Sequence, residues 1–121
     1  MADKTRETTQ KEFKQFKTTF TQYQQMFGLS GYEIYFKFEP LDCAFATISV
    51  REEDMVATVT LTSETSEKDL AFLDVEKSAK HEAIHLLLAR MAYLVCKREY
   101  SGDDEREAEE EAVNRLIKLL P

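Results

Sequence analysis

The sequence predicts a single α+β domain, residues 1–121, in which one helix precedes a three-stranded antiparallel sheet and two helices follow it. Two observations lead to this expectation. Apolar residues recur at helical steps of three and four in residues 5–27 and 74–100. Between them, residues 31–62 hold three short runs in which apolar and polar residues alternate, separated by polar turns. A chain of 121 residues can bury about two-thirds of its unfolded surface, which suits one domain.

Residues 5–27 are expected to form an amphipathic helix that Gly28 ends. Its apolar stripe is mostly aromatic and consists of Phe13, Phe16, Phe20, Tyr23 and Phe27. We expect this stripe to pack on the domain's own sheet. Docking onto a second copy or another protein is the alternative, because an aromatic stripe also suits a partner.

The three alternating runs cover residues 31–39, 44–51 and 55–62. Their connections, residues 40–42 and 52–54, are short and polar or contain proline. Short connections favour an antiparallel meander with one buried face. The last run is rich in threonine on one face, so we expect it at an exposed or edge position.

The last third of the chain is expected to be helical. After a loop or short helix at residues 63–73, Asp74 can cap a long helix that runs to about Tyr100. Asp103 or Asp104 can begin the final helix, which carries an apolar stripe. The stripe consists of Ala112, Val113, Leu116, Ile117, Leu119 and Leu120. The apolar residues expected in the core from the long helix are Ile84, Leu87, Leu88, Met91 and Val95.

Composition narrows the function classes. The chain is 43% hydrophobic and 32% charged, which is typical of a folded globular protein. A net charge of −7 argues against nucleic acid as the main partner. No apolar run approaches the roughly 20 residues that cross a bilayer, and the first residues lack the apolar core of a signal peptide. Cys43 and Cys96 have no CxxC or disulfide-framework spacing, so we expect a cytoplasmic location. Without an apolar span we expect no membrane partner.

Both histidines of the chain lie in one motif, because residues 81–85 read His-Glu-Ala-Ile-His, or HExxH. Residues four apart on a helix lie on one face, about 6 Å from each other. The imidazoles of His81 and His85 can therefore reach one Zn²⁺ at roughly 2.0–2.1 Å. The intervening Glu82 can then address a water on the metal. The motif predicts a zinc site.

A catalytic zinc usually has three protein ligands, and the chain holds no third histidine. Cys96 lies about 16 Å along the same helix from His85 and is excluded, whereas Cys43, in a predicted turn, stays open. On the final helix, Glu109 projects onto the middle of the apolar stripe and Glu110 lies one step off it. Glu109 is therefore the first candidate ligand and Glu110 the alternative. In a third interpretation both stay solvated near the start of the helix.

The order of a helix, a small antiparallel sheet, an HExxH helix and a glutamate-bearing helix resembles a minimal gluzincin, the zincin-like fold of zinc metallopeptidases. Residues 109–121 are similar to the ExEAN-x-FA-x-x-LL-x-P pattern of the ImmA/IrrE-like peptidases, with Val113 in place of Asn and Arg115 in place of Phe. Residues 81–88 resemble the HExxHLLL of small phage-encoded proteins assigned as metallopeptidases. Glu110 with Asn114 also follows the ExxxD-like spacing of other gluzincins.

The expected function is zinc-dependent hydrolysis of peptide bonds. In this scheme His81, His85 and Glu109 hold Zn²⁺, and Glu82 is the general base. The resemblance implies a peptide or protein substrate that lies extended along the edge strand, residues 55–62 or its neighbour. The oxyanion donor stays open among Tyr93, Tyr100 and Tyr35.

Two other functions remain open at this point. One is a non-catalytic protein-binding module on a metallopeptidase-like fold, such as a phage or mobile-element protein that grips a host factor. It would act through residues 1–27 or through the acidic segment 103–111. The other is an α+β structural domain without metal.

Overall fold

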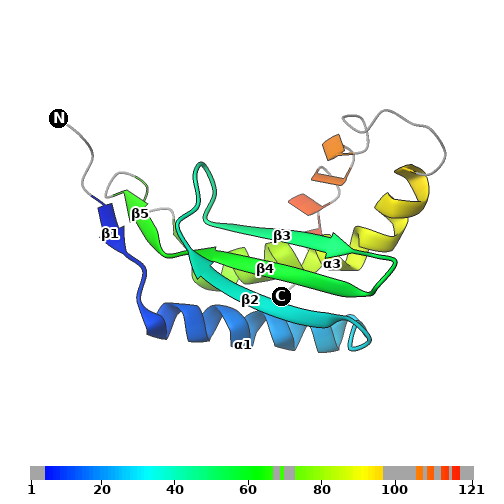
Figure 1. Ribbon diagram of the computed structural model, residues 1–121, viewed down its shortest axis with the longest axis horizontal. Coiled ribbons are helices and arrows are strands. Elements are labelled where there is room, and N and C mark those ends of the chain that lie inside the picture. The colour runs from blue at the N-terminus through cyan, green and yellow to red at the C-terminus, as the bar shows by residue number, and fades with distance from the viewer. Residues whose placement is uncertain are drawn as a thin grey trace.

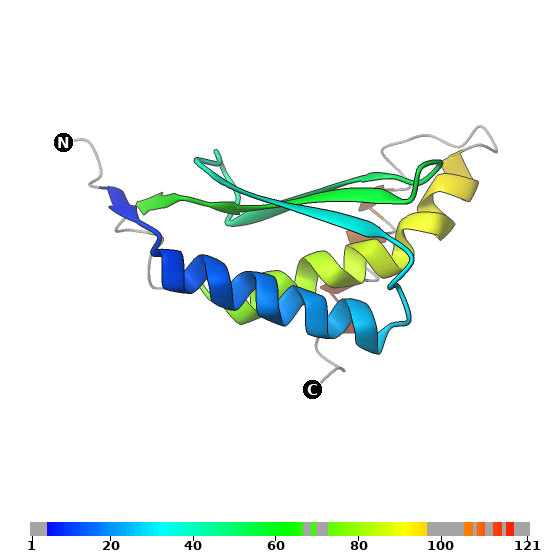
Figure 2. The same ribbon diagram turned by 60° about the horizontal axis from the view of Figure 1, so that its bottom comes forward.

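The computed structural model has two layers, a three-stranded sheet and two helices that lie together on one of its faces (Figure 1 and Figure 2). It describes residues 5–66, 69, 73–96, 106, 107, 109, 110, 113, 114, 116 and 117. The α+β class expected from the sequence is confirmed. The elements, in chain order, are β1 (Thr5–Glu7), α1 (Gln10–Met26), β2 (Glu33–Glu39), β3 (Ala46–Arg51), β4 (Val56–Thr62), β5 (Glu64–Ser66) and α3 (Val75–Cys96).

The first helix begins later than expected, because residues 5–7 form strand β1 and pair antiparallel with β5. Helix α1 starts after Thr9, whose side chain accepts a hydrogen bond from the Glu12 amide at 3.1 Å. The Glu12 carboxylate in turn accepts from the Thr9 amide at 3.0 Å. This reciprocal pair is a capping box, and the sequence signal for it is a threonine followed three residues later by a glutamate. The predicted helix over residues 5–27 was therefore wrong in its first turn.

Removing the cap should weaken the fold measurably. We expect Thr9→Ala to lower the free energy of unfolding by about 1 kcal/mol, because the Glu12 amide at the start of α1 loses its side-chain partner. Thr18→Ala, at an exposed position of the same helix, is the matched control and should leave the value nearly unchanged. Urea denaturation of the three proteins measures this difference. Equal midpoints for Thr9→Ala and Thr18→Ala would contradict it.

The sheet is mixed rather than an antiparallel meander, and its strand order is β2-β4-β3. Strand β3 pairs antiparallel with β4, as a hairpin does, but β2 pairs parallel with β4 on the other side. The expected edge position of residues 55–62 was therefore wrong. The central strand is β4, and the edge strand next to α3 is β3 (Figure 1).

The connection between β2 and β3 explains this order. Residues 40–45 are long enough to cross the roughly 10 Å that separates two strands with a third between them. Both flanks of the connection bind the end of β4: the Thr62 amide donates to the Phe45 carbonyl at 2.8 Å, and the Ser63 amide donates to the Glu39 carbonyl at 3.0 Å. Threonine is β-branched and fits a central strand, so the threonines of β4 did not indicate an exposed edge. Thr60 and Thr62 are in fact buried.

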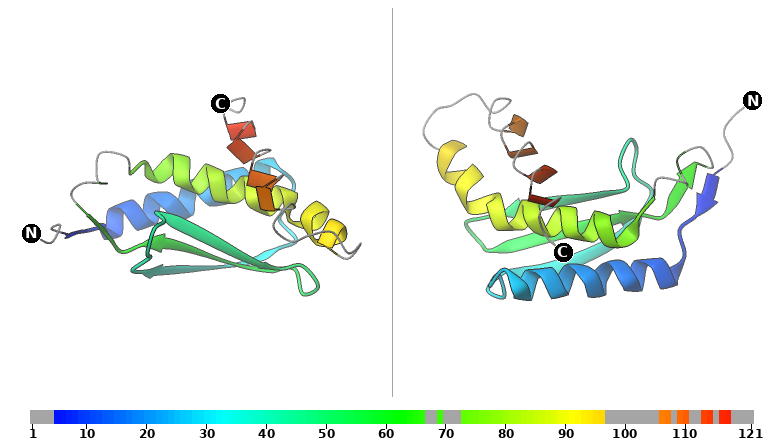
Figure 3. Two further views of the ribbon diagram at one scale, coloured as in Figure 1. Left: turned by 90° about the horizontal axis from the view of Figure 1, so that it is seen from above. Right: turned by 180° about the vertical axis from the view of Figure 1, so that it is seen from behind.

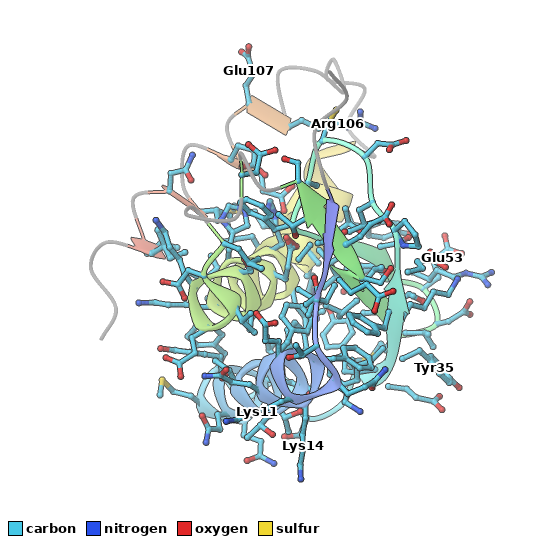
Figure 4. All side chains as sticks on the ribbon, turned by 90° about the vertical axis from the view of Figure 1, so that its left-hand side faces the viewer. Lys11, Lys14, Tyr35, Glu53, Arg106 and Glu107 are labelled. Atoms are coloured by element: carbon cyan, nitrogen blue, oxygen red, sulfur yellow. The ribbon has the colours of Figure 1, made fainter. Side chains whose placement is uncertain are left out.

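The aromatic stripe of α1 packs against the inner face of the sheet. Phe16 and Phe20 are fully buried, and Phe20 meets the Phe36 ring of β2 edge-on at 5.6 Å between centroids. Phe13 stacks on Phe38 of the same strand at 4.7 Å. Figure 4 shows the other side of α1, where Lys11 and Lys14 point away from the sheet. The stripe is thus used within the domain.

Helix α3 lies beside α1 and carries the histidine motif in its second and third turns. Asp74 caps it as expected, since its carboxylate accepts from the Lys77 amide at 3.0 Å. Ile84 is buried, but Leu87 and Met91 are 37% and 53% exposed, so their expected place in the core was wrong. These two residues lie one turn apart on one side of α3. Residues 97–105, with the expected end of this helix and the start of the next, lie outside the described residues.

The described residues near the C-terminus are helical and cross α3 near its middle, as the two views of Figure 3 agree. Val113 is fully buried there. Figure 4 shows Arg106 and Glu107 on the side of the molecule opposite Lys11 and Lys14. This crossing brings the glutamates of the final segment to the histidines of α3.

Candidate metal centre

The two histidines of α3 point their Nε2 atoms at each other. The Nε2 atoms of His81 and His85 are 3.1 Å apart, and the side chains are 29% and 15% exposed. Burial, with the neighbouring His85, lowers the pKa of His81, so its imidazole is neutral and its lone pair available at neutral pH. Helical spacing alone produces this convergence, as the motif predicted.

Glu110 completes a group of three that could hold a metal ion. Its carboxylate oxygens lie 2.7 Å from Nε2 of His85 and 3.8 Å from Nε2 of His81. Two donor atoms at 2.0–2.1 Å from a tetrahedral ion would be about 3.3 Å apart. The two Nε2 atoms, at 3.1 Å, are close to that separation, and a different oxygen of Glu110 faces each imidazole. Two imidazole nitrogens and a carboxylate oxygen are also a donor set that zinc accepts. The residues present therefore fit a metal ion in size and chemistry.

Glu109 binds the other nitrogen of His85. Its Oε1 atom lies 3.1 Å from Nδ1, and the carboxylate side chain is 22% exposed. A carboxylate accepts from a ring N–H, and the tautomer with its proton on Nδ1 donates to Glu109. This tautomer leaves the Nε2 lone pair facing Glu110. Two acceptors that face each other repel unless a cation lies between them. A metal ion held by the group of three would be such a cation.

Glu82 is buried beside these ligands and is 6% exposed. Burial raises its pKa to about 7, with Glu110 adding to the rise and His85 opposing it. A carboxyl group that titrates near neutral pH is suited to accept and return a proton. The structure thus brings together His81, Glu82, His85, Glu109 and Glu110, the HExxH residues and the two candidate glutamates.

These residues line one wall of a cleft of about 610 Å³ between α3 and β3. The strand side of the cleft is formed by Ala46, Thr47, Ile48 and Val50. A second hollow of about 270 Å³ shares Ala46, His81 and Glu82 with it and continues toward the start of α3. The candidate centre therefore lies along a groove that extends to both sides of the histidines.

The tyrosines proposed as oxyanion donors have different positions. Tyr35 is 52% exposed on the outer face of β2, where its hydroxyl donates to Glu33, so it is remote from the cleft (Figure 4). Tyr93 lines the cleft, and its hydroxyl donates to Glu53 at 2.7 Å. Tyr100 lies outside the described residues.

Cys43 is not part of the group of three. Cys43 is exposed in the connection between β2 and β3, with a φ of 61°, and lines a separate hollow there. The side chain of Cys96 lies outside the described set.

No helix within the described residues is long and apolar enough to cross a membrane. Comparisons of the chain with protein-family models, with curated proteins and with solved structures gave no match. The geometry of the metal centre and its cleft is therefore the basis for a functional proposal.

Proposed function

We propose that the protein is a zinc-dependent metallopeptidase in which His81, His85 and Glu110 hold the metal. The observation that carries this proposal is the convergence of the three donor atoms, all within 4.8 Å of one another, beside the buried Glu82. Structural zinc sites are usually closed by four protein ligands, whereas catalytic sites have three and leave one position for water or substrate. Three ligands at the wall of an open cleft fit the second type.

Zinc is the proposed ion because of the donor set. Two imidazoles with one carboxylate hold zinc in peptidases and non-haem iron in oxygenases. The HExxH spacing, with Glu82 beside the ligands, favours zinc. Glu109 would then act on the site through His85, since the hydrogen bond between them would fix the orientation and the tautomer of the imidazole. The sequence had placed Glu109 first and Glu110 second as the third ligand. In this proposal Glu110 binds the metal and Glu109 binds His85.

Glu82 is the proposed general base. When bound, zinc would polarise the carbonyl of the peptide bond and lower the pKa of a water molecule to about 7. The Glu82 carboxylate would take the proton from that water and later give it to the leaving amine. Burial raises the pKa of Glu82, the direction that suits a carboxyl group which takes up a proton and returns it.

Strand β3 is the proposed platform for an extended peptide, in place of residues 55–62. The Phe45 carbonyl accepts from the Thr62 amide, so alternate residues from Phe45 onward bond to β4. The residues between them direct their amides and carbonyls to the free edge. These are Ala46, Ile48 and Val50, all of which line the cleft. A peptide could therefore pair with β3 next to the metal.

Hydrolysis of a peptide library tests the proposal. We expect the purified protein to bind about one zinc per chain and to cleave members of the library. A chelator should abolish cleavage, and added zinc should restore it. Zinc content by elemental analysis and cleavage products by mass spectrometry are the measurements. A protein that carries no zinc, or that cleaves equally well after its removal, would contradict the proposal.

The binding-module alternative has less support. It relied on the aromatic stripe of residues 1–27, and Phe16 and Phe20 of that stripe are fully buried in the domain. The other surface it invoked, residues 103–111, lies mostly outside the described residues.

A further inference from the structure

The face of α3 that carries the histidines continues beyond them as small side chains. Ala89 and Ala92 follow His85 by one and two turns and line the same cleft. Alanine leaves space where a larger residue would fill the gap between α3 and β3. The cleft therefore extends from the metal centre along the helix, away from its N-terminus.

The strand opposite supplies an apolar wall. Ile48 and Val50 of β3 line the cleft across from the two alanines. Beyond Val50, Glu52 lines the same cleft in the turn between β3 and β4. The result is an apolar passage that starts near the metal centre and has a carboxylate at its far end. We call this passage, formed by Ile48, Val50, Ala89, Ala92 and Glu52, the side channel.

A buried tyrosine holds the carboxylate of the side channel in place. The Tyr32 hydroxyl donates to Oε2 of Glu52 at 2.7 Å, and Tyr32 is 9% exposed. Burial and the bond to Glu52 raise the pKa of Tyr32 to about 12, so it stays a neutral donor at neutral pH. Tyr32 orients the Glu52 carboxylate without neutralising it.

Glu52 is also the cleft carboxylate that the metal centre does not use. Glu82, Glu109 and Glu110 each have a proposed part at the metal, whereas Glu52 lies at the other end of the side channel. Among the described residues that line the cleft, the arginine is Arg106, which is exposed and comes from the C-terminal segment. No ion pair between Glu52 and Arg106 occurs within the described structure. The hydrogen bond that the structure gives the Glu52 carboxylate comes from Tyr32, on which the charge of Arg90 also acts.

We propose that the cleft takes peptides with a lysine or arginine near the bond to be cleaved, and that Glu52 determines this preference. The aliphatic stem of the basic side chain would lie between β3 and α3, and its charged end would pair with Glu52. This inference rests on the proposed function, because it places a peptide in the same cleft.

Binding of labelled peptides to the zinc-loaded Glu82→Gln protein tests the preference without turnover. The probes are capped, alanine-rich hexapeptides with a single lysine, norleucine or glutamate at each central position in turn. Norleucine has the stem of lysine without its charge. We expect lysine at one position to bind at least about tenfold more tightly than norleucine, as a charged hydrogen bond provides. Fluorescence anisotropy measures the dissociation constants.

Substitutions at two neighbouring positions distinguish a specific effect of Glu52 from the general effect of acidic residues in the turn. Glu52→Gln should remove the advantage of lysine and leave the affinity for the norleucine peptide unchanged. Glu53→Gln is the matched control, because Glu53 does not line the cleft and glutamine can still accept from Tyr93. It should keep the advantage of lysine. The inference is overturned if lysine and norleucine bind alike at every position, if both variants lose the preference equally, or if no peptide binds.

Failure of the lysine preference can be distinguished from failure of the proposed peptidase function. A lysine preference that depends on Glu52, in a protein whose parent form cleaves nothing, would support the side channel and reject the peptidase. Zinc-dependent cleavage without any lysine preference would support the peptidase and reject the role of Glu52 in the side channel.

Discussion

Replacing Glu82 by glutamine is expected to lower the rate of peptide hydrolysis by about 10²–10⁴-fold while zinc stays bound at one per chain. Glutamine has the shape of glutamate but cannot take a proton from water. Glu82 is beside the three donor atoms and is not one of them, so the metal should be retained. The measurement is kcat on a cleaved library peptide, with zinc content determined on the same samples.

A control for this substitution exists on the same helix. Glu76→Gln removes an exposed carboxylate in the first turn of α3 that accepts a hydrogen bond from Gln15. It should leave both kcat and zinc content unchanged. If Glu82→Gln cleaves as fast as the parent protein, Glu82 is not the base, and if it loses zinc, its role is in holding the metal.

The two glutamates of the final segment should differ sharply when each is replaced by alanine. We expect Glu110→Ala to weaken zinc binding by more than about 100-fold, because it removes a ligand. Glu109→Ala should weaken it by about 10–100-fold, because His85 loses the partner that orients its ring. Competition with a chromophoric chelator measures both constants.

The absorption spectrum of the cobalt-substituted protein adds a readout that affinity alone lacks. Glu109→Ala should keep the spectrum of the parent, since the same three residues bind the metal. Glu110→Ala should change it, since a water replaces the carboxylate. Glu107→Ala, at an exposed position of the same segment, is the control and should alter neither property. The assignment is refuted if Glu109→Ala changes the spectrum and Glu110→Ala does not.

The helices could be predicted from the sequence because their signals are local. Asp74 at the start of α3 and the four-residue spacing of His81 and His85 act within a few residues of chain. The capping box of Thr9 and Glu12 is equally local, and reading it would have placed the start of α1 correctly. Alternation likewise identified the three strands of the main sheet.

The order of those strands could not be predicted in the same way. Alternation shows which side chains share a face, but it does not show which strand lies next to which. The position of β4 between β2 and β3 depends on bonds from Thr62 and Ser63 to the two ends of a connection some 20 residues earlier. The pairing of β1 with β5 joins residues about 60 positions apart and has no local signal.

The ranking of the two glutamates shows that a helical projection predicts which side chain points inward but not which one reaches the metal site. It correctly placed Glu109 further inward, since its side chain is 22% exposed and that of Glu110 is 51% exposed. The inward direction, however, leads to Nδ1 of His85, on the far side of the ring from the two Nε2 atoms. Glu110 reaches those atoms from the flank. The difference comes from how the final segment crosses α3, which the sequence of one helix does not contain.

A crystal structure of the zinc-loaded protein, with anomalous scattering measured at the zinc edge, tests the metal centre most directly. We expect one ion per chain, at about 2.0–2.2 Å from Nε2 of His81, Nε2 of His85 and a carboxylate oxygen of Glu110, with Glu109 still bound to Nδ1 of His85. An ion ligated by Glu109 instead, an ion at another site, or the absence of any anomalous peak between the two histidines would contradict the account.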